Sequence, residues 1–189
     1  ILSNIQNLIG SDHNDDLTGD WQDNFIAAGL GDDTIAGHNG KDTLLGEQGN
    51  DTIHGWDGDD MMQGGEGNDT LYAGNGNDNL QGGQGNDILS GDDGADTIKG
   101  GTGNVIAYSG SGADIIHGDQ GYDVLYGGDQ DDIIYGGEGN DGVYGGNGND
   151  ILEGGAGADD INGSNGIDTA SYASSAEAVT INLAEGIAQ

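Results

Sequence analysis

The stretch that decides the fold is Gly82-Gly83-Gln84-Gly85-Asn86-Asp87-Ile88-Leu89-Ser90, because its pattern recurs every nine residues. Counting in nines from Gly10 gives 18 consecutive units that end at Ser171, without one insertion. Position one is Gly in 15 units, position four is Gly in 15, position six is Asp in 16, and position eight is apolar in all 18. A glycine-rich chain of low complexity would not keep this phase, so the nonapeptide is a structural unit.

The residue types at each position predict a turn followed by a short strand. Glycines at positions one, two and four permit backbone angles closed to other residues, which allows a tight turn. The last three residues, such as Ile88-Leu89-Ser90, are expected to be extended, with only the middle side chain pointing inward. Two units make one 18-residue coil. About nine coils stacked ~4.8 Å apart then form an all-β, right-handed parallel β-roll (a solenoid) with the position-eight side chains as its core.

The charge of the chain sets a second constraint. The chain carries 35 acidic side chains against two basic ones, Lys41 and Lys99, for a net charge of -33, and it has no cysteine. Low hydrophobicity with such a charge is typical of disorder, since the apolar column alone cannot offset the entropy of ordering the chain. Two lysines cannot neutralise a phosphate backbone, which excludes nucleic acid as a partner. No apolar run approaches the ~20 residues that span a bilayer. The chain must therefore recruit a cation in order to fold.

The position-six aspartates are the candidate metal ligands. Stacking places their carboxylates ~4.8 Å apart, where two unit charges repel by ~3.5 kcal/mol at an effective dielectric near 20. A divalent cation between each pair turns this repulsion into attraction, and hard oxygen ligands in a flexible loop suit Ca²⁺ better than Mg²⁺. The alternative, solvated turn formers, does not require Asp at every ninth residue. The predicted ligands are Asp15, Asp33, Asp42, Asp51, Asp60, Asp69, Asp78, Asp87, Asp96, Asp114, Asp123, Asp132, Asp141, Asp150, Asp159 and Asp168.

The number of ions follows from the gaps between stacked loops. Nine loops on each side leave eight gaps, hence 16 possible sites. Val105 removes two of these and Asn24 weakens one, which leaves 13 gaps flanked by two carboxylates. Three of the 13 touch a unit that lacks the position-four glycine, at His13 or Gln130. We therefore expect about ten or more bound Ca²⁺.

The repeat resembles the calcium-binding nonapeptide of the repeats-in-toxin (RTX) family, the hemolysin-type calcium-binding region, over residues 10–171. The resemblance implies Ca²⁺ held between successive glycine-rich loops by Asp side chains and backbone carbonyls. It also implies export from a bacterium by type I secretion, with folding on calcium outside the cell, as a structural and secretion-assisting module. The alternative is an accessory carbohydrate-binding module similar to the R-modules of mannuronan C-5 epimerases. Only Lys41 and Lys99 could contact a polyuronate, which weakens that alternative.

No catalytic centre is expected in this segment. His13, His38, His54 and His117 are scattered and show no nucleophile or zinc-ligand spacing, so they are expected to be surface residues. Because Ile1 is neither an initiator Met nor the start of a signal peptide, we expect a segment of a longer secreted or cell-surface protein. Any catalytic activity should then lie in other domains of that protein, which are expected partners together with calcium ions.

The flanks of the repeat are expected to cap it. Residues 1–9 are predicted to be an N-terminal cap or linker strand, and residues 172–189 a C-terminal cap or a link to a next module. Within the second flank, Val179, Ile181 and Leu183 alternate as in a strand, and Glu185-Gly186 is typical of a turn.

The outward positions seven and nine are where a partner would bind. Tyr72, Tyr108, Tyr126 and Tyr144 are expected to stack on one face of the roll. We favour β-propensity as their reason over a contact surface for a glycan or a neighbouring domain, because aromatic residues stack well in ladders on any sheet face.

Three features depart from the repeat. The unit Gly100–Tyr108 has lost its Asp (Val105) and its large core residue (Ala107), and is predicted to be a local defect that bends or loosens the roll, with a binding notch as the alternative. Trp21 and Trp56 are predicted to lie in the loops and to serve as local covers. The first two units are predicted to be worn end repeats.

Overall fold

The fold is an all-strand solenoid. The computed structural model describes residues 5–174, in which every regular element is a β-strand. The described residues include no helical segment with the length and hydropathy that a membrane span requires. The strands are β1 (Asn7–Ile9), β2 (Asp16–Thr18), β3 (Phe25–Leu30), β4 (Thr34–Asn39), β5 (Thr43–Gln48), β6 (Thr52–Asp57), β7 (Met61–Glu66), β8 (Thr70–Asn75), β9 (Asn79–Gln84), β10 (Ile88–Asp93), β11 (Thr97–Thr102), β12 (Ile106–Ser111), β13 (Ile115–Gln120), β14 (Val124–Asp129), β15 (Ile133–Glu138), β16 (Gly142–Asn147), β17 (Ile151–Ala156), β18 (Asp160–Asn165) and β19 (Thr169–Ala170).

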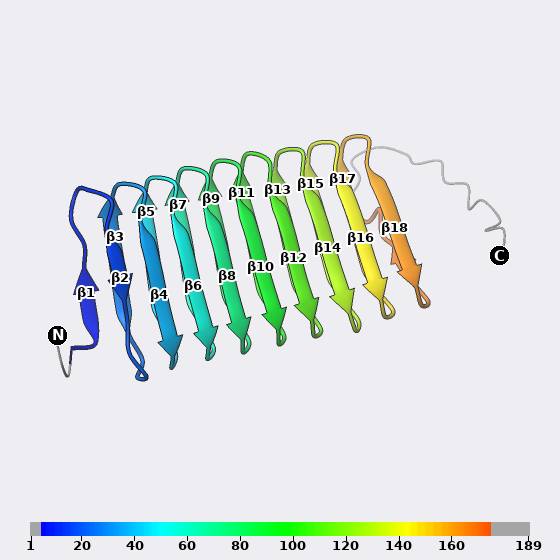
Figure 1. The fold of residues 1–189 in the computed structure, drawn as a ribbon. Helices are drawn as coiled ribbons and strands as arrows, with labels where there is room; N and C mark the ends of the chain where they lie inside the picture. Colours follow the sequence, from blue (N-terminus) through cyan, green and yellow to red (C-terminus); the bar gives the residue numbers. More distant parts are fainter. Residues whose placement is uncertain (1–4, 175–189) are drawn as a thin grey trace.

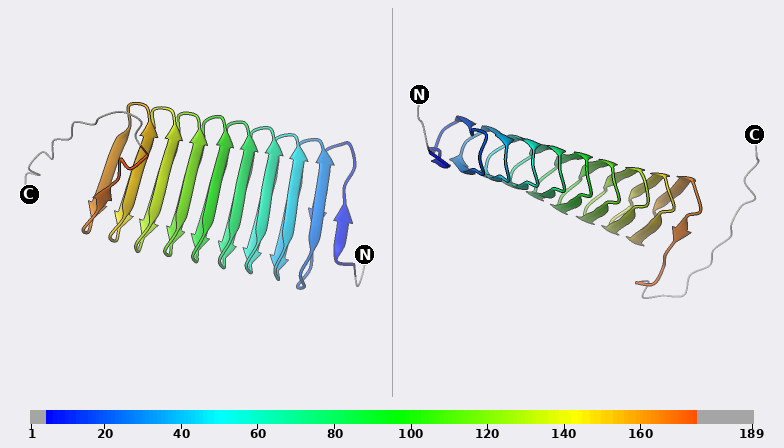
Figure 2. Two further views of the ribbon diagram at one scale, coloured as in Figure 1. Left: turned by 180° about the vertical axis from the view of Figure 1, so that it is seen from behind. Right: turned by 90° about the horizontal axis from the view of Figure 1, so that it is seen from below.

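Two parallel sheets face each other. The odd-numbered strands form a ten-stranded sheet and the even-numbered strands a nine-stranded sheet, which is the front layer in Figure 1. Partner residues are 18 apart, as in the pairing of Leu71 with Leu89 and of Leu89 with Ala107. Seen from below, the sheets appear as two layers joined by loops (Figure 2). The predicted parallel β-roll of about nine 18-residue coils is therefore confirmed.

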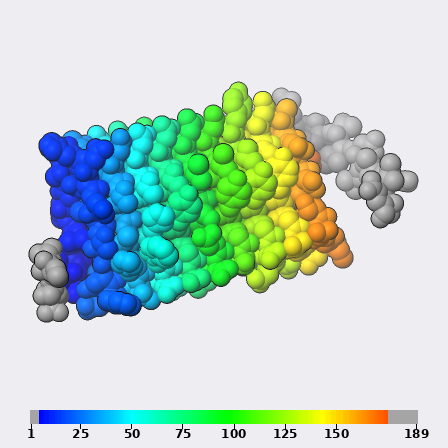
Figure 3. All heavy atoms as spheres, viewed as in Figure 1, coloured from blue at the N-terminus to red at the C-terminus, as the bar shows by residue number. Residues whose placement is uncertain are grey.

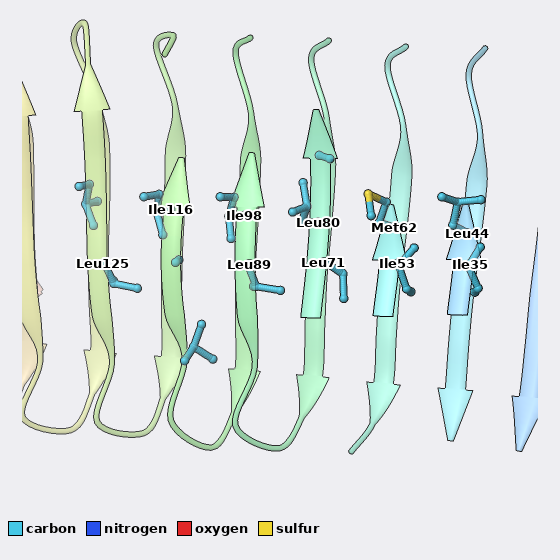
Figure 4. Close-up of a cluster of buried hydrophobic side chains, with 14 of the residues drawn as sticks. Ile35, Leu44, Ile53, Met62, Leu71, Leu80, Leu89, Ile98, Ile116 and Leu125 are labelled. Carbon is cyan, nitrogen blue, oxygen red and sulfur yellow. The ribbon is translucent and has the colours of Figure 1, made fainter. Parts of the chain in front are cut away.

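The core is the predicted column of position-eight side chains. Leu71, Leu80, Leu89 and Ile98 are completely buried, and Figure 4 shows such side chains projecting from both sheets into the space between them. The residues nearest the ends, Leu8, Leu17 and Ile161, are only partly buried against this core. Because the apolar layer is one side chain thick, each coil depends on the coils directly above and below it. In Figure 3 the colours follow one another along the roll in sequence order, so each coil lies beside the coils that precede and follow it in the chain.

The strands are longer than the three residues predicted. Most span six, from position seven of one unit to position three of the next, as in β10 (Ile88–Asp93). The ladder continues past the position-one glycine, since Asp92 pairs with Gly74 and Asp93 with Asn75. A hydrogen-bonded backbone at positions two and three thus replaces part of the expected turn, which shrinks to positions four to six.

The prediction that position-one glycines are needed for their backbone angles is wrong. Positive φ angles occur at positions two and four, as at Gly83 (118°) and Gly85 (131°), whereas Gly82 at position one is not among the positive-φ residues. Position one points into the roll, where Ala28, Ala73 and Ser109 are also fully buried. The requirement at position one is therefore for a small side chain.

Gln130 carries a backbone strain that glycine would relieve. It occupies position four with a φ of 83°, in the left-handed region that favours glycine. We expect Gln130→Gly to raise the unfolding free energy of the calcium-loaded protein by about 1 kcal/mol, the relieved strain exceeding the entropy cost of glycine. Denaturant unfolding measures this change. Gln130→Ala keeps the strain and is the control; equal stability of the two variants would contradict the explanation.

The flanks are partly described. β1 (Asn7–Ile9) pairs with β3 and continues the odd-numbered sheet by one short strand. After β19 the described chain ends at residue 174, where Ser171 and Ser174 donate hydrogen bonds to the Glu153 carboxylate. The predicted strand with Val179, Ile181 and Leu183, and the turn at Glu185-Gly186, lie outside the described residues.

Candidate calcium sites

The position-six aspartates form two columns, one along each edge of the roll. Each lies in the loop that precedes a strand, so loops before even-numbered strands build one column and loops before odd-numbered strands the other. Asp15, Asp159 and Asp168 at the ends of the columns are half-buried. The remaining predicted ligands are buried, from Asp33 to Asp150. Burial of so many carboxylates within 19 kDa requires compensation.

One oxygen of each buried carboxylate has a structural partner. Asp69 Oδ1 accepts a hydrogen bond from the Asp51 backbone N–H (2.8 Å), and Asp78 Oδ1 accepts one from Asp60 (2.7 Å). The same bond joins position-six residues 18 apart along both columns, including Val105 N–H to Asp123 Oδ1 (2.8 Å). These bonds fix each carboxylate against the preceding coil.

The other oxygen has no hydrogen-bond partner. Such orphaned, buried Oδ2 atoms are costly, because a polar atom removed from water without a partner loses its solvation. The same unpaired oxygen recurs in coil after coil, so one class of ligand would serve all of these positions. The atoms belong to Asp33, Asp42, Asp51, Asp60, Asp69, Asp78, Asp87, Asp96, Asp114, Asp123, Asp132, Asp141 and Asp150.

At many of the orphaned oxygens, a backbone carbonyl of the next coil lies beside the same position-one residue. A Cβ placed on Gly118 would lie 2.5 Å from Asp123 Oδ2 and 2.5 Å from the Gly136 carbonyl oxygen of the next coil. A Cβ on Gly46 would likewise meet Asp51 Oδ2 and the Gly64 carbonyl oxygen. Position one is therefore small because two oxygen atoms converge beside it.

The electrostatics of the columns disfavour the charged carboxylates. Burial raises the pKa of Asp60 to about 7, with smaller contributions from the charges of Asp42 and Asp78 and against the lowering effect of the Asp42 backbone hydrogen bond. Burial likewise raises the pKa of Asp132 to about 7 and that of Asp96 to about 6. A column that must stay ionised near neutral pH therefore needs a counter-charge inside it.

This donor set fits a hard divalent cation. The orphaned carboxylate oxygens and the adjacent carbonyls are all oxygen atoms, which Ca²⁺ prefers. In residues 5–174, no three His, Asp or Glu side chains converge on one point. Any ion between two coils would thus draw its remaining protein ligands from backbone carbonyls, in line with the expectation from the resemblance.

The two interruptions of the columns behave differently from each other. At Val105, a methyl carbon takes the place of the carboxylate oxygen, since a Cβ on Gly100 would lie 2.9 Å from Val105 Cγ2. At Asn24, by contrast, the side-chain oxygen already has a partner, because Oδ1 accepts a hydrogen bond from the Asp20 backbone N–H (2.7 Å). Asp15 at the same end has an Oδ2 that already accepts from the Ser11 backbone N–H (2.5 Å).

The predicted defect at Gly100–Tyr108 does not break the ladder. β12 (Ile106–Ser111) pairs in the standard register with both β10 and β14. Val105 and Ala107 are buried with 1% and 0% of their surface exposed. An apolar Val in the column therefore costs carboxylate ligands while leaving the roll continuous.

A second polar column was missed in the sequence. At position five, Asn50 Oδ1 accepts from the Asn68 backbone N–H (2.8 Å), and Asn68 Oδ1 accepts from Asn86 (2.8 Å). These bonds run in the opposite direction to those of the neighbouring aspartates, so loops joined by both are clamped in both directions. Lys41, Ala95, Ala113 and Tyr122 at position five lack the acceptor and interrupt this second column. The frequent Asn or Asp at position five was the available signal, since short amides stack in ladders on such repeats.

Comparison with known proteins agrees with this geometry. The sequence model of the family described as the RTX calcium-binding nonapeptide repeat matches residues 5–35, 36–71, 72–107, 108–143 and 143–170. A search of curated proteins finds no match. The family is a structural calcium-binding module rather than a catalytic one. The matched segments cover nearly the whole roll, and the chain is therefore a calcium-binding β-roll module that belongs to the RTX calcium-binding nonapeptide repeat family.

Proposed function

We propose that the 16 predicted aspartates hold Ca²⁺ between successive coils and that the roll folds only when these ions bind. The observation that carries this proposal is the repeated, buried Oδ2 atom without a hydrogen-bond partner. The ions would lie where carboxylates of adjacent loops and position-one carbonyls face the same space, and would supply positive charge to the columns. About ten or more ions per chain are proposed, with fewer or weaker sites at Val105, Asn24 and the two ends.

We further propose that residues 10–171 work as a folding switch within a larger secreted bacterial protein. An unfolded, strongly acidic chain suits export, and calcium outside the cell then drives folding after export. The half-buried end aspartates Asp15 and Asp168 support a role for residues 1–9 and 172–189 as caps or as links to further modules. Catalytic activity, where the parent protein has one, would belong to those other modules.

The carbohydrate-binding alternative receives less support from the tyrosine ladder. Tyr126 stacks on Tyr108 and on Tyr144 with ring centroids 5.0 Å apart in both pairs. The rings thus cover each other's faces and offer mainly their edges to solvent. A sugar ring that stacks on an aromatic face would find Tyr126 already covered on both sides.

A calcium titration followed by circular dichroism tests the switch. We expect the midpoint of strand formation to fall at roughly 10⁻⁴–10⁻³ M free Ca²⁺, the range of extracellular calcium modules. A chain exported unfolded must remain so at the far lower calcium concentration of the cytosol. A midpoint below about 10⁻⁷ M, in the range of intracellular calcium buffers, would contradict the switch, even if calcium binding itself were observed.

A further inference from the structure

Three strained side chains gather on the outer face of the even-numbered sheet. Position two of this sheet holds His38, Trp56 and Asp92, with φ angles of 79°, 82° and 70°. Glycine adopts this conformation freely, and other residues pay for it. Gly74, which lies between Trp56 and Asp92, keeps glycine with a φ of 106°. Strained residues persist where the surrounding structure holds them and often mark functional positions.

The register turns this arrangement into a slot. Trp56 pairs with Gly74, and Gly74 pairs with Asp92, so the three stand in one column on consecutive coils of the sheet. One face of Trp56 stacks on His38, with centroids 6.4 Å apart and an interplanar angle of 19°. His54, in the same strand, lies tilted against the indole with centroids 6.1 Å apart and an interplanar angle of 34°. Gly74, next in the column, has no side chain, and the hollow there is bordered by both Trp56 and Asp92. Two coil spacings separate Trp56 from Asp92, which is about 10 Å.

The side wall of the slot is also aromatic. Tyr72 lies in the same strand as Gly74 and is held by stacking on His54, with centroids 5.0 Å apart and an interplanar angle of 10°. The Asp92 side chain is held by a hydrogen bond within its own strand, which Ser90 Oγ donates to Asp92 Oδ1 (2.8 Å). The resulting hollow of about 250 Å³ is lined by His54, Trp56, Tyr72, Ala73, Gly74 and Asp92.

The chemistry of these walls selects a cation. A charge over Gly74 would lie one coil spacing, about 5 Å, from the backbone positions of both Trp56 and Asp92, and an aromatic face attracts a cation within ~6 Å. The net charge of -33 disfavours anions. A methylated ammonium is weakly hydrated and large enough to touch both walls, whereas a primary ammonium loses more hydration energy on entry. We propose that the slot over Gly74 binds a methylated ammonium group.

The test titrates tetramethylammonium chloride into the calcium-loaded protein at constant ionic strength, in a Trp21→Phe background that leaves Trp56 as the single tryptophan. We expect saturable quenching of Trp56 fluorescence and an upfield shift of the ligand methyl protons, caused by the indole ring. Trp21 is 83% exposed, so its replacement should not change binding. Butylammonium, a primary ammonium like that of lysine, is the comparison ligand and should bind more weakly than tetramethylammonium. Glucose and 3,3-dimethylbutan-1-ol, the uncharged counterpart of choline, should not compete.

Two variants assign the walls. Trp56→Gly restores the glycine of the repeat and relieves the strain, so it should fold at least as well in calcium while methyl shifts disappear and affinity falls about tenfold or more. Asp92→Asn removes only the charge, because Asn tolerates the left-handed conformation and keeps the acceptor for Ser90; affinity should fall about threefold or more. Binding that survives Trp56→Gly, or equal binding of the uncharged alcohol or of glucose, would overturn the proposal.

Discussion

Chelation of calcium at about pH 7.5 is expected to abolish most of the strand structure of residues 10–171, and excess Ca²⁺ is expected to restore it. Without the ion, the columns contain carboxylates such as Asp60 and Asp132 whose Oδ2 atoms are buried and unpaired. A ligand that binds the folded state alone shifts the equilibrium toward folding, and metal sites that exist only in the folded chain couple binding to folding. Far-ultraviolet circular dichroism with and without chelator measures the change.

The same electrostatics predict that acid partly replaces calcium. The pKa of Asp60 and of Asp132 is raised from 3.8 to about 7 in the calcium-free roll, chiefly by burial. The folded chain therefore binds more protons than the unfolded chain between about pH 4 and 7, and its stability rises as the pH falls through this window. In chelator, strand signal should increase from about pH 7.5 to 4.5. Calcium should bind more weakly over the same interval, because protons compete for the carboxylates.

Two outcomes would contradict the explanation that buried carboxylate charge makes folding depend on calcium. Identical spectra with and without chelator at neutral pH would show that the roll tolerates its buried carboxylates unaided. A chelated chain that stays equally unfolded at every pH would show that carboxylate charge is not what opposes folding. Magnesium at the same concentration is the control for ionic strength, and it should restore less structure because it demands near-ideal octahedral geometry.

The strict period made the coil predictable. Insertion-free spacing fixes the 18-residue offset, so the position-eight apolar residue and the position-six Asp must each form columns, as Leu89 and Asp87 do. The roles of the two oxygen atoms in each carboxylate could not be predicted from the sequence. That Asp87 uses one oxygen to hold the preceding coil and leaves the other free depends on side-chain torsions, which spacing does not encode.

The remaining differences arise from the backbone. The ladder extends through Asp92 and Asp93 because residues in the left-handed conformation can remain in register between identical coils, and strand propensity gives no sign of this. Trp56 was predicted to be a loop cover, yet it lies in β6 (Thr52–Asp57) with 56% of its surface exposed. Trp21, the other predicted cover, is 83% exposed and shields little. The same 18-residue offset places Gly74 beside Trp56, but it gives no sign that the strand continues through both positions with Trp56 in the left-handed conformation.

Replacement of one carboxylate oxygen at the centre of a column is expected to have a large effect on calcium affinity and on stability. Asp78→Asn keeps the Oδ1 that accepts from the Asp60 backbone N–H (2.7 Å) and changes only the orphaned Oδ2 into an amide. Both gaps beside Asp78 lose a ligand, so the calcium midpoint should rise severalfold and the calcium-loaded roll should lose on the order of 3 kcal/mol, as when one partner of a buried charge pair is removed. Calcium titration and denaturant unfolding measure the two effects.

Asp93→Asn is the matched control, because it makes the same chemical change in the next coil of the same chain. Asp93 is exposed, at position three, and belongs to neither carboxylate column. Loss of its charge reduces repulsion and should leave the calcium midpoint and the stability nearly unchanged. If instead both variants shifted the midpoint equally, net charge alone would govern calcium uptake and the stacked position-six carboxylates would not be the sites. Because each coil contacts only its neighbours, the same change at the half-buried Asp168 should cost less than at Asp78, with only one flanking gap affected.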